Sequence, residues 1–254
     1  MPRRSRRPQF RPLAVLFDLD GVLIDTMPLH AKAWRDACRT FGLRVGTKDI
    51  YAREGEPGAV TARDIVRRAV ARRDFAGTDG RRRRARRAST SPPGLATRLL
   101  AEKERRFPAL ATRVKVPRRW GTLLSRLSEA GLRLALVTGT SSREVRRVVP
   151  EGVRRWFDAI VTGDQVRRGK PHPGPYRKAL RALRIPPGRA LVVENAPYGI
   201  RSARRAGAGM ILALASSLPP AYLREADEVV RSAPALRNRI LRLVRPLAGR
   251  KLEA

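Results

Sequence analysis

Short, continuous runs of apolar residues recur along the second half of this chain and occur once near its start. Such runs are typical of strands buried on both faces of a parallel sheet, and they lie at 13–18, 132–139, 157–163, 189–195 and 209–214. Stretches with the periodicity of amphipathic helices lie beside them, at 120–130, 143–149, 176–183 and 199–208. This alternation predicts an α/β fold with a doubly wound, mostly parallel sheet, and 209–214 is the last clear strand.

A mostly helical segment interrupts the alternation after the first strand. Helices are expected at 28–42, 61–73 and 95–106, with a loop at 55–60 and a low-complexity stretch rich in helix breakers at 74–94. The chain should therefore divide into a basic, disordered arm at 1–12, a core at 13–25 and 114–250, and an inserted helical cap at 26–113.

The charge of the chain is strongly positive, with 56 basic and 22 acidic residues and a formal net charge of +34. Seven of the basic residues are lysines and 49 are arginines, and the arginines occur in nearly every segment. Because aromatic residues make up only 5%, stacking platforms for single-stranded nucleic acid are scarce. A dispersed, solvated surface is favoured over a nucleic-acid footprint. The run Arg81 to Arg87 leaves a docking patch for nucleic acid or an anionic membrane surface as the alternative.

The remaining composition indicates a cytoplasmic protein. Cys38 is the only cysteine, so no intrachain disulfide can form and a reducing compartment fits. No apolar run approaches the roughly 18 residues of a membrane span. The opening residues carry the charge of a signal peptide without its apolar region. We expect a monomer without a membrane span.

Chemically suggestive residues stand where the predicted strands end. Asp18 and Asp20 follow the first strand, two apart and hence on one side, and Thr138 and Gly139 follow the second. A loop after the third strand carries Lys170, and Glu194 and Asn195 end the fourth. Because ligands bind outside the carboxyl ends of parallel strands, the fold should gather these groups around one crevice.

Four stretches carry a resemblance to a known family: "FDLDGVLIDT", "LVTGTS", "GKPHPGPY" and "VVENAPYGIRSARRAGA". In this order they resemble the four motifs of the haloacid-dehalogenase-like superfamily. They are most similar to its β-phosphoglucomutase and phosphoglycolate-phosphatase-like branch, and the resemblance spans residues 13–214. It implies a Rossmann-like core, a cap inserted after the first strand, Mg²⁺ as cofactor and an aspartyl-phosphate intermediate.

The resemblance also implies roles for individual residues. Asp18 would be the nucleophile and a Mg²⁺ ligand, and Asp20 would act as acid and base while its backbone carbonyl binds the metal. Thr138 and the backbone at Gly139 would hold the transferring phosphoryl oxygens. Lys170 would neutralise the aspartyl-phosphate, and it stands out as a lysine in a chain that strongly prefers arginine.

Glu194 and Asn195 complete the expected metal site. An unpaired carboxylate at the end of an apolar strand would be costly, and metal coordination, directly or through water, removes the cost for Glu194. Asn195 stands where many relatives have Asp, so its amide oxygen can bind Mg²⁺ but brings no charge. Capping of the following helix is the alternative for Asn195.

The expected cap should choose the substrate. His30 and Trp34 lie four apart on one helix face, and the resemblance places the histidine near the active site; a merely exposed histidine stays open, and Trp34 is expected to pack. Arg53 lies in the expected substrate-reading loop "REGEPG", where Glu54 and Glu56 would repel a second phosphate.

The sequence thus predicts a Mg²⁺-dependent phosphatase of a small phosphorylated metabolite, of the sugar phosphate or phosphoglycolate type. A β-phosphoglucomutase-like phosphomutase is the alternative within the same fold. A polyanion-binding or nucleic-acid-binding protein that uses its Arg-rich segments is the alternative from another class.

Overall fold

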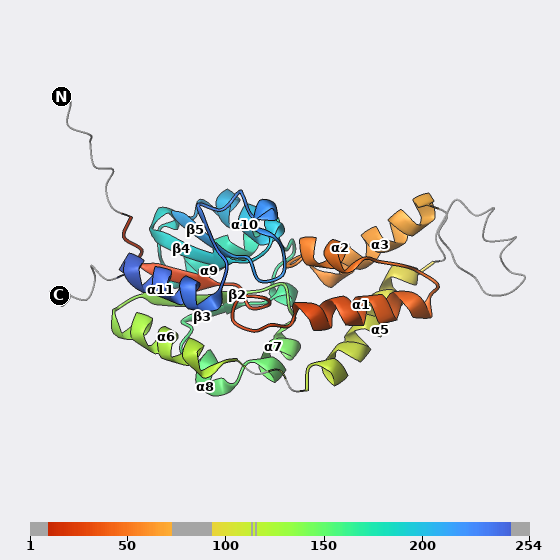
Figure 1. Cartoon of the computed structure of the whole chain (residues 1–254), viewed down its shortest axis with the longest axis horizontal. Helices are drawn as coiled ribbons and strands as arrows, with labels where there is room; N and C mark the ends of the chain where they lie inside the picture. Colours follow the sequence, from red (N-terminus) through yellow and green to blue (C-terminus); the bar gives the residue numbers. More distant parts are fainter. Residues whose placement is uncertain (1–9, 73–92, 113, 115, 245–254) are drawn as a thin grey trace, which may run out of the picture.

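A parallel β-sheet with helices on both faces forms one part of the molecule, and a group of helices forms the other (Figure 1). The computed structural model describes residues 10–72, 93–112, 114 and 116–244. The expectations for most of the basic arm, for Arg81 to Arg87 and for the last residues of the core concern residues outside these ranges.

Within the described residues the sheet has six strands in the order β3-β2-β1-β4-β5-β6, and every neighbouring pair is parallel. The strands are β1 (Ala14–Phe17), β2 (Arg133–Val137), β3 (Ala159–Val161), β4 (Ala190–Glu194), β5 (Met210–Leu214) and β6 (Glu228–Val230). The register places Phe17 of β1 beside Leu136 of β2 and Val193 of β4. The residues that follow these three therefore emerge together at one edge, and the predicted doubly wound sheet is confirmed.

Alternate residues of the central strands serve two separate hydrophobic cores. Val15 and Phe17 face one cluster, whereas Ala14 and Leu16 face the other. Helices α6 (Arg118–Glu129), α7 (Ser142–Val148), α8 (Glu151–Arg154) and α11 (Ala233–Val244) cover the first face. Helices α9 (Gly174–Leu183) and α10 (Pro197–Ala206) cover the second. Both faces are buried, which explains why the strands are continuous apolar runs.

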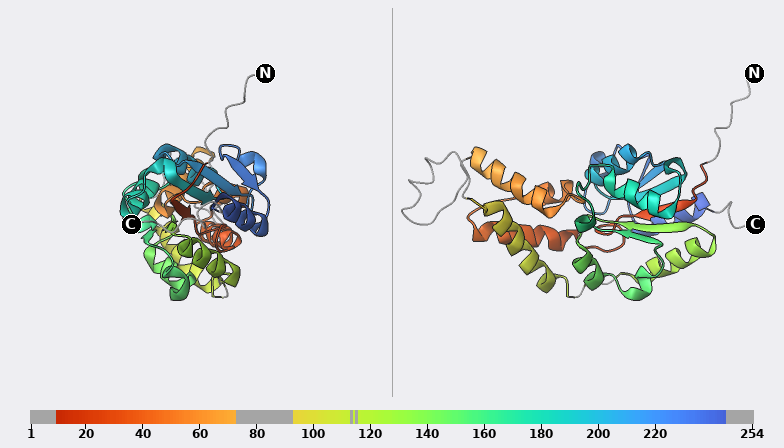
Figure 2. Two further views of the ribbon diagram at one scale, coloured as in Figure 1. Left: turned by 90° about the vertical axis from the view of Figure 1, so that its left-hand side faces the viewer. Right: turned by 180° about the vertical axis from the view of Figure 1, so that it is seen from behind.

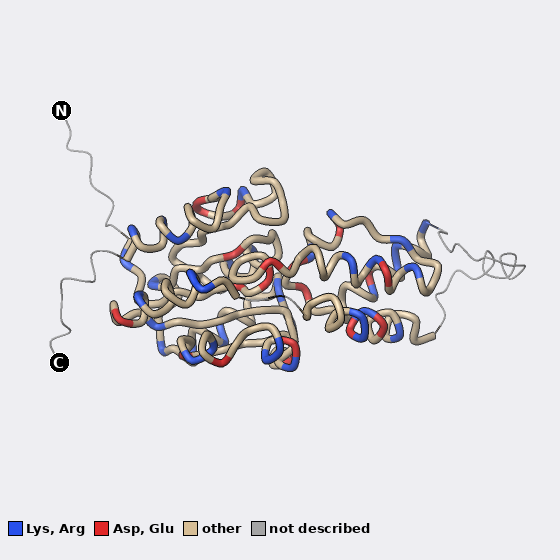
Figure 3. The backbone as a smooth tube through the Cα atoms, turned by 60° about the horizontal axis from the view of Figure 1, so that its bottom comes forward, with Lys and Arg blue, Asp and Glu red and all other residues tan. Residues whose placement is uncertain are grey.

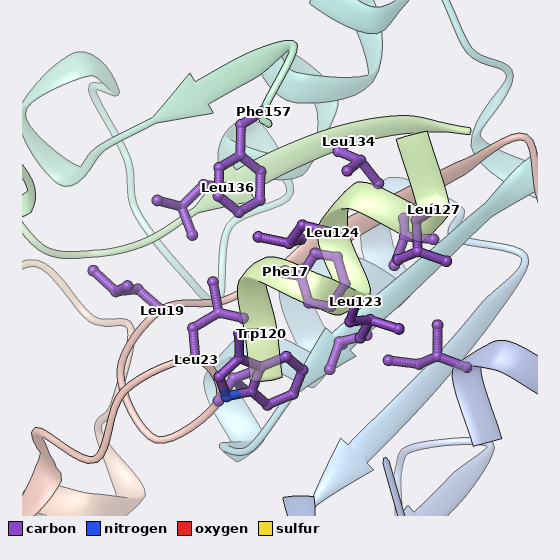
Figure 4. Packing of buried hydrophobic residues seen from close by; sticks show 14 of the residues in the cluster. Phe17, Leu19, Leu23, Trp120, Leu123, Leu124, Leu127, Leu134, Leu136 and Phe157 are labelled. Carbon is purple, nitrogen blue, oxygen red and sulfur yellow. The ribbon is translucent and has the colours of Figure 1, made fainter. Parts of the chain in front are cut away.

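Aromatic side chains fill the centre of the first core (Figure 4). The Phe17 ring meets the rings of Trp120 and Phe157 edge to face, at centroid distances of 6.3 and 6.4 Å. This packing fixes the end of β1 directly before Asp18, which is the residue whose position matters most for the site.

Among the described residues, the second part of the molecule consists of helices that lie beside the sheet (Figure 2). They are α1 (Met27–Thr40), α2 (Thr47–Ala52), α3 (Gly58–Arg72) and α5 (Leu95–Leu110). They bury a third cluster of their own, which includes Trp34 as a packing residue. The expected domain boundaries at 26 and 113 stay a prediction.

Several elements differ from the sequence-based expectation. Helix α3 begins at Gly58, so the expected loop at 55–60 is helical in its second half, and α2, α8 and α11 were not predicted. One further strand, β6, follows 209–214, which is the last clear strand of the sequence pattern. Strand β6 has three half-buried residues and pairs with β5 on one side only. It therefore lacks the apolar run from which a buried strand is predicted.

Candidate active site

Three of the expected site residues meet at the edge of the sheet where β1, β2 and β4 end. Lys170 Nζ donates to Asp18 Oδ1 at 2.6 Å, to Glu194 Oε1 at 2.6 Å and to the Val137 carbonyl oxygen at 3.0 Å. The three charged side chains are 98% buried or more. A cation is thus held between two carboxylates by strands that the register aligns.

Glu194 has partners for both of its carboxylate oxygens. Besides Lys170, Oε1 accepts the Tyr176 hydroxyl at 2.5 Å, and Oε2 accepts the Asn195 backbone N–H at 3.1 Å. A Cβ on Gly199 would lie 1.9 Å from Oε1, so the glycine lets α10 approach this carboxylate without displacing it. The sequence prediction missed Tyr176, although a tyrosine on an otherwise apolar helix face is a signal for a buried polar partner.

Asp20 is held by a different set of groups. Its Oδ1 accepts the Thr26 hydroxyl and lies 3.3 Å from His30 Nε2, while Oδ2 accepts the hydroxyls of Thr140 at 2.6 Å and Thr138 at 3.3 Å. Burial alone would raise the pKa of Asp20, but the contacts with His30, Thr140 and Thr26 outweigh burial and lower it. This arrangement favours the ionised form, which is the form of a base.

Asp18 experiences the opposite balance. Burial, together with the negative charges of Glu194 and Asp20, raises the pKa of Asp18 to about 8 although Lys170 opposes the shift. Burial would lower the pKa of Lys170, but Asp18 and Glu194 outweigh it and raise that pKa, so the lysine stays charged. The site therefore has an excess of negative charge that one lysine does not balance.

The loop between α2 and α3 is docked directly on this edge of the sheet. Gly55 has a φ of +79°, and a Cβ there would lie 2.6 Å from Lys170 Cδ. A Cβ on Gly139, in the turn after β2, would lie 2.8 Å from the Gly55 carbonyl oxygen. Two glycines thus permit the close approach of the helical part to the sheet.

Arg53 and the two glutamates of the loop line a cavity beside the sheet edge, and each has a partner within the protein. The Arg53 guanidinium contacts Asp64 and donates to Glu56 at 3.1 Å, and Glu56 also accepts the Thr61 hydroxyl at 2.7 Å. Glu54 turns to the sheet, where its Oε2 accepts from Asn195 Nδ2 at 2.7 Å. Each glutamate thus has a partner within the protein, and the interpretation that both repel a second phosphate stays a prediction.

A cavity of about 330 Å³ lies between the sheet edge and the helices. Asp18, Asp20 and the Thr138–Gly139 turn line its floor, while His30 and Arg53 are among the residues that line its walls. His30 is 91% buried, so the interpretation of an exposed histidine is wrong. A ligand of small-metabolite size would fit this space and reach Asp18.

Lys103 is a wall residue that the sequence prediction missed. Its Nζ lies 4.8 Å from the centroid of the Phe107 ring and 3.7 Å from Glu144 Oε1. The Phe107 ring in turn stacks on the His30 ring at a centroid distance of 4.0 Å. Lys103 falls on the buried stripe of α5 between Leu99 and Phe107. A rare lysine at an apolar helix position was the available signal.

The donor set at the edge of the sheet fits a divalent cation. Among the described residues, no three His, Cys, Asp or Glu side chains form a ready metal-binding group, so a metal would also need amide or carbonyl oxygens. Asn195 Oδ1 is such an oxygen, fully buried and without a hydrogen-bond partner. A Mg²⁺ ion would satisfy it and would offset the charge of the surrounding carboxylates, which are Asp18, Asp20, Glu54 and Glu194.

The fold and this strand-end arrangement define a hydrolase class. The family model of haloacid dehalogenase-like hydrolases matches residues 12–207, and the chain belongs to this family. The predictions of the family and of an enzyme of the hydrolase class are thereby confirmed.

Individual relatives and solved structures indicate which members of the family this chain resembles. The phosphorylated carbohydrates phosphatase of Thermotoga maritima is 30% identical over 213 residues, which are 81% of this chain and 86% of that protein. The structure of CbbY from Rhodobacter sphaeroides in complex with phosphate is 27% identical with a TM-score of 0.66, covering 89% of this chain and 96% of that one. β-Phosphoglucomutase from Clostridium difficile, 20% identical, shares the fold with a TM-score of 0.73 over 94% of this chain and 100% of that one.

Two further findings bear on partners. Among the helices that the structure describes, none combines the length and the apolar composition that crossing a bilayer requires. Lys and Arg positions are spread over both parts of the molecule (Figure 3), as the dispersed-surface interpretation expects of the residues described.

Proposed function

We propose that the protein is a Mg²⁺-dependent phosphatase of a small phosphorylated metabolite, of the sugar phosphate or phosphoglycolate type. The observation that carries the proposal is the buried Asp18 carboxylate, which Lys170 holds at 2.6 Å on the floor of the cavity, with Asp20 beside it. The relatives named as phosphatases support it.

Asp18 would act as the nucleophile in two steps. Its carboxylate oxygen attacks the phosphorus, the bond from phosphorus to the leaving oxygen breaks, and an aspartyl-phosphate forms. Asp20 gives a proton to the leaving oxygen and then takes one from the water that cleaves the Asp18–phosphorus bond. The lowered pKa of Asp20 suits the second half of this role, and the first half requires that it gain a proton beforehand.

The surrounding groups would hold the transferring phosphoryl oxygens and their charge. Lys170 already contacts Asp18 and would neutralise the aspartyl-phosphate. The Thr138 hydroxyl and the Gly139 backbone lie on the same floor of the cavity and would bind phosphoryl oxygens.

Mg²⁺ would be held by Asp18, the Asp20 carbonyl oxygen and Asn195, with Glu194 acting directly or through water. When bound, it would polarise the phosphoryl group and offset negative charge. The unpartnered Asn195 Oδ1 supports its inclusion. Both oxygens of Glu194 already have protein partners, which favours the water-mediated role for this residue.

We also propose that helices α1, α2, α3 and α5 act as the cap that closes the cavity and selects the substrate. Its own hydrophobic cluster and its docked loop support a distinct cap. His30, Arg53 and Lys103 line the cavity and would meet the part of the substrate that is not transferred.

We favour release of inorganic phosphate over the mutase reaction, in which the phosphoryl group returns to the sugar. A mutase must grip a second phosphate while it excludes water. Arg53 forms ion pairs with Asp64 and Glu56, so its positive charge is already neutralised and the loop has little net positive charge with which to bind a second phosphate.

The test is a phosphate-release screen over phosphorylated metabolites, with Mg²⁺ and with chelator. We expect Mg²⁺-dependent release from at least one small sugar phosphate or from phosphoglycolate. Incubation with β-glucose 1-phosphate, Mg²⁺ and a trace of the bisphosphate separates the alternatives. Glucose 6-phosphate that accumulates much faster than free phosphate would assign the protein as a mutase instead.

The setting of the enzyme stays a prediction. The single, buried Cys38 is compatible with the expected cytoplasm, and a monomer is expected. Polyanion binding through the Arg-rich segments would require salt-sensitive retention on DNA that depends on Arg81 to Arg87.

A further inference from the structure

Glu54 belongs to the helical part of the molecule, but its carboxylate lies among the site residues of the sheet. It is 94% buried, and only one of its two oxygens has a hydrogen-bond partner. Oε2 accepts from Asn195 Nδ2, whereas Oε1 has no partner. A buried carboxylate oxygen without a donor is costly, which indicates that a positive group belongs beside it.

The side chains of Glu54 and Asn195, each of which has one unpartnered oxygen, reach the same turn. A Cβ built on Gly21 would lie 3.0 Å from Glu54 Oε1 and 1.9 Å from Asn195 Nδ2. Gly21 follows Asp20, so both side chains reach the turn that carries the expected metal-binding carbonyl. Two hydrogen-bonded side chains therefore meet at one turn, and each has one buried oxygen that lacks a donor.

The charges explain why a glutamate would be useful here. Asn195 supplies an oxygen to the site but no negative charge. Oxygen-ligand sites for hard divalent cations depend on the number of charged ligands. Glu54 brings a carboxylate to the same place from the opposite part of the molecule.

We propose that Glu54 is part of the divalent-cation site and supplies from the cap the charge that Asn195 does not supply from the core. This inference rests on the proposed Mg²⁺ dependence. Because Glu54 reaches the site only while its loop is docked, the binding of the cation and the docking of the loop stabilise each other.

Direct measurement of Mg²⁺ binding tests the proposal without substrate. Isothermal titration calorimetry of the full chain would compare the wild type with Glu54→Gln, and Glu56→Gln is the matched control. The control removes the same charge from the same loop, but Glu56 contacts Arg53 and Thr61 instead of the sheet. We expect affinity to fall by about tenfold or more in Glu54→Gln and to stay within about twofold in Glu56→Gln.

A second variant tests the compensation between the two residues. Adding Asn195→Asp to Glu54→Gln returns one carboxylate to the site from the core, so Mg²⁺ affinity should recover. Hydrogen exchange of the backbone amides then measures how firmly the loop is docked. Mg²⁺ should slow exchange at residues 54–58 in the wild type and in Glu56→Gln, but not in the restored double variant.

The outcomes separate this inference from the proposed function. Unchanged Mg²⁺ affinity in a folded Glu54→Gln variant would leave Glu54 as a simple hydrogen-bond partner of Asn195 and overturn the inference alone. Failure of Asn195→Asp to restore affinity would overturn the compensation in the same way. A wild-type protein that binds no Mg²⁺ would overturn the metal dependence of the proposed function, and the inference with it.

Discussion

Two buried cations of this molecule are each held between two carboxylates, one in the sheet part and one in the helical part. Lys170 lies between Asp18 and Glu194 at the ends of parallel strands. Arg53 lies between Glu56 and Asp64, both of which belong to the helical part. Arg53 lines the cavity, and Lys170 contacts Asp18, which lines it as well, so charge and position alone would suggest similar roles.

The partners of the two cations make them different. Asp18 is the group that we expect to accept a phosphoryl group, so the charge opposite Lys170 changes during the reaction and the lysine takes part in it. The partners of Arg53 keep their charge and hold the loop and α3 together. The presence of an arginine in a recognition loop therefore does not by itself indicate a negatively charged substrate, because the arginine can be neutralised by carboxylates of the protein.

The largest effect that this comparison predicts follows from removing the reacting partner of Lys170. Asp18→Asn should lose phosphate release down to background while the fold survives, because a neutral amide cannot act as the nucleophile. The same change in the helical part, Asp64→Asn, should keep turnover within about threefold, since Arg53 retains Glu56. A phosphate-release assay with circular dichroism as the folding control measures both. Substantial turnover by folded Asp18→Asn would break the comparison.

The second effect concerns Asp20, which contacts neither of the two cations. Asp20→Asn leaves Asp18 and Lys170 in place but removes the proton carrier, so turnover should fall by roughly 10²- to 10⁴-fold. A pH–rate profile of the variant against the wild type is the measurement. A near-normal rate across pH would contradict the acid–base role.

The part of the site that lies on the strands could be predicted from sequence. Asp18, Thr138 and Glu194 follow apolar runs, and parallel strands in register deliver the residues that follow them to one edge. Lys170 comes from a loop, yet its rarity as a lysine and its motif indicated it. The sheet topology determines which residues meet at this edge, and the pattern of hydrophobic residues is sufficient to predict the topology.

The contacts between the two parts of the molecule could not be predicted in the same way. Glu54 and Asn195 are 141 positions apart and meet because a glycine at position 55 lets the loop dock. No periodicity encodes such docking, and the loop motif alone indicated Glu54 only as a group that repels phosphate. Lys103 is different, since its place on the apolar stripe of α5 can be recognised from the helical periodicity of the sequence.

The third effect compares the two cations through stability. Lys170→Met leaves Asp18 and Glu194 buried without their cation, and we expect a loss of about 3–5 kcal/mol in the free energy of unfolding. Arg53→Met should cost clearly less, because Asp64 keeps Arg67 and Arg68 as partners and Glu56 keeps Thr61. Urea unfolding at neutral pH in the presence of chelator measures both. Equal losses would show that the two ion-pair clusters do not differ as argued.

The smallest effect concerns Lys103, the wall cation that is held more loosely than the other two. Its Nζ is 3.7 Å from Glu144 Oε1, so its charge is available to the part of the substrate that is not transferred. Lys103→Met keeps most of the side-chain volume and removes the charge. We expect KM to rise by about three- to tenfold with kcat nearly unchanged, because the contact is the same in the ground state and the transition state. Arg53→Met, whose charge is already neutralised, should raise KM less, and Glu144→Gln should leave KM equal or lower. If steady-state kinetics give Arg53→Met the larger KM effect, the loop arginine is the cation that meets the substrate after all.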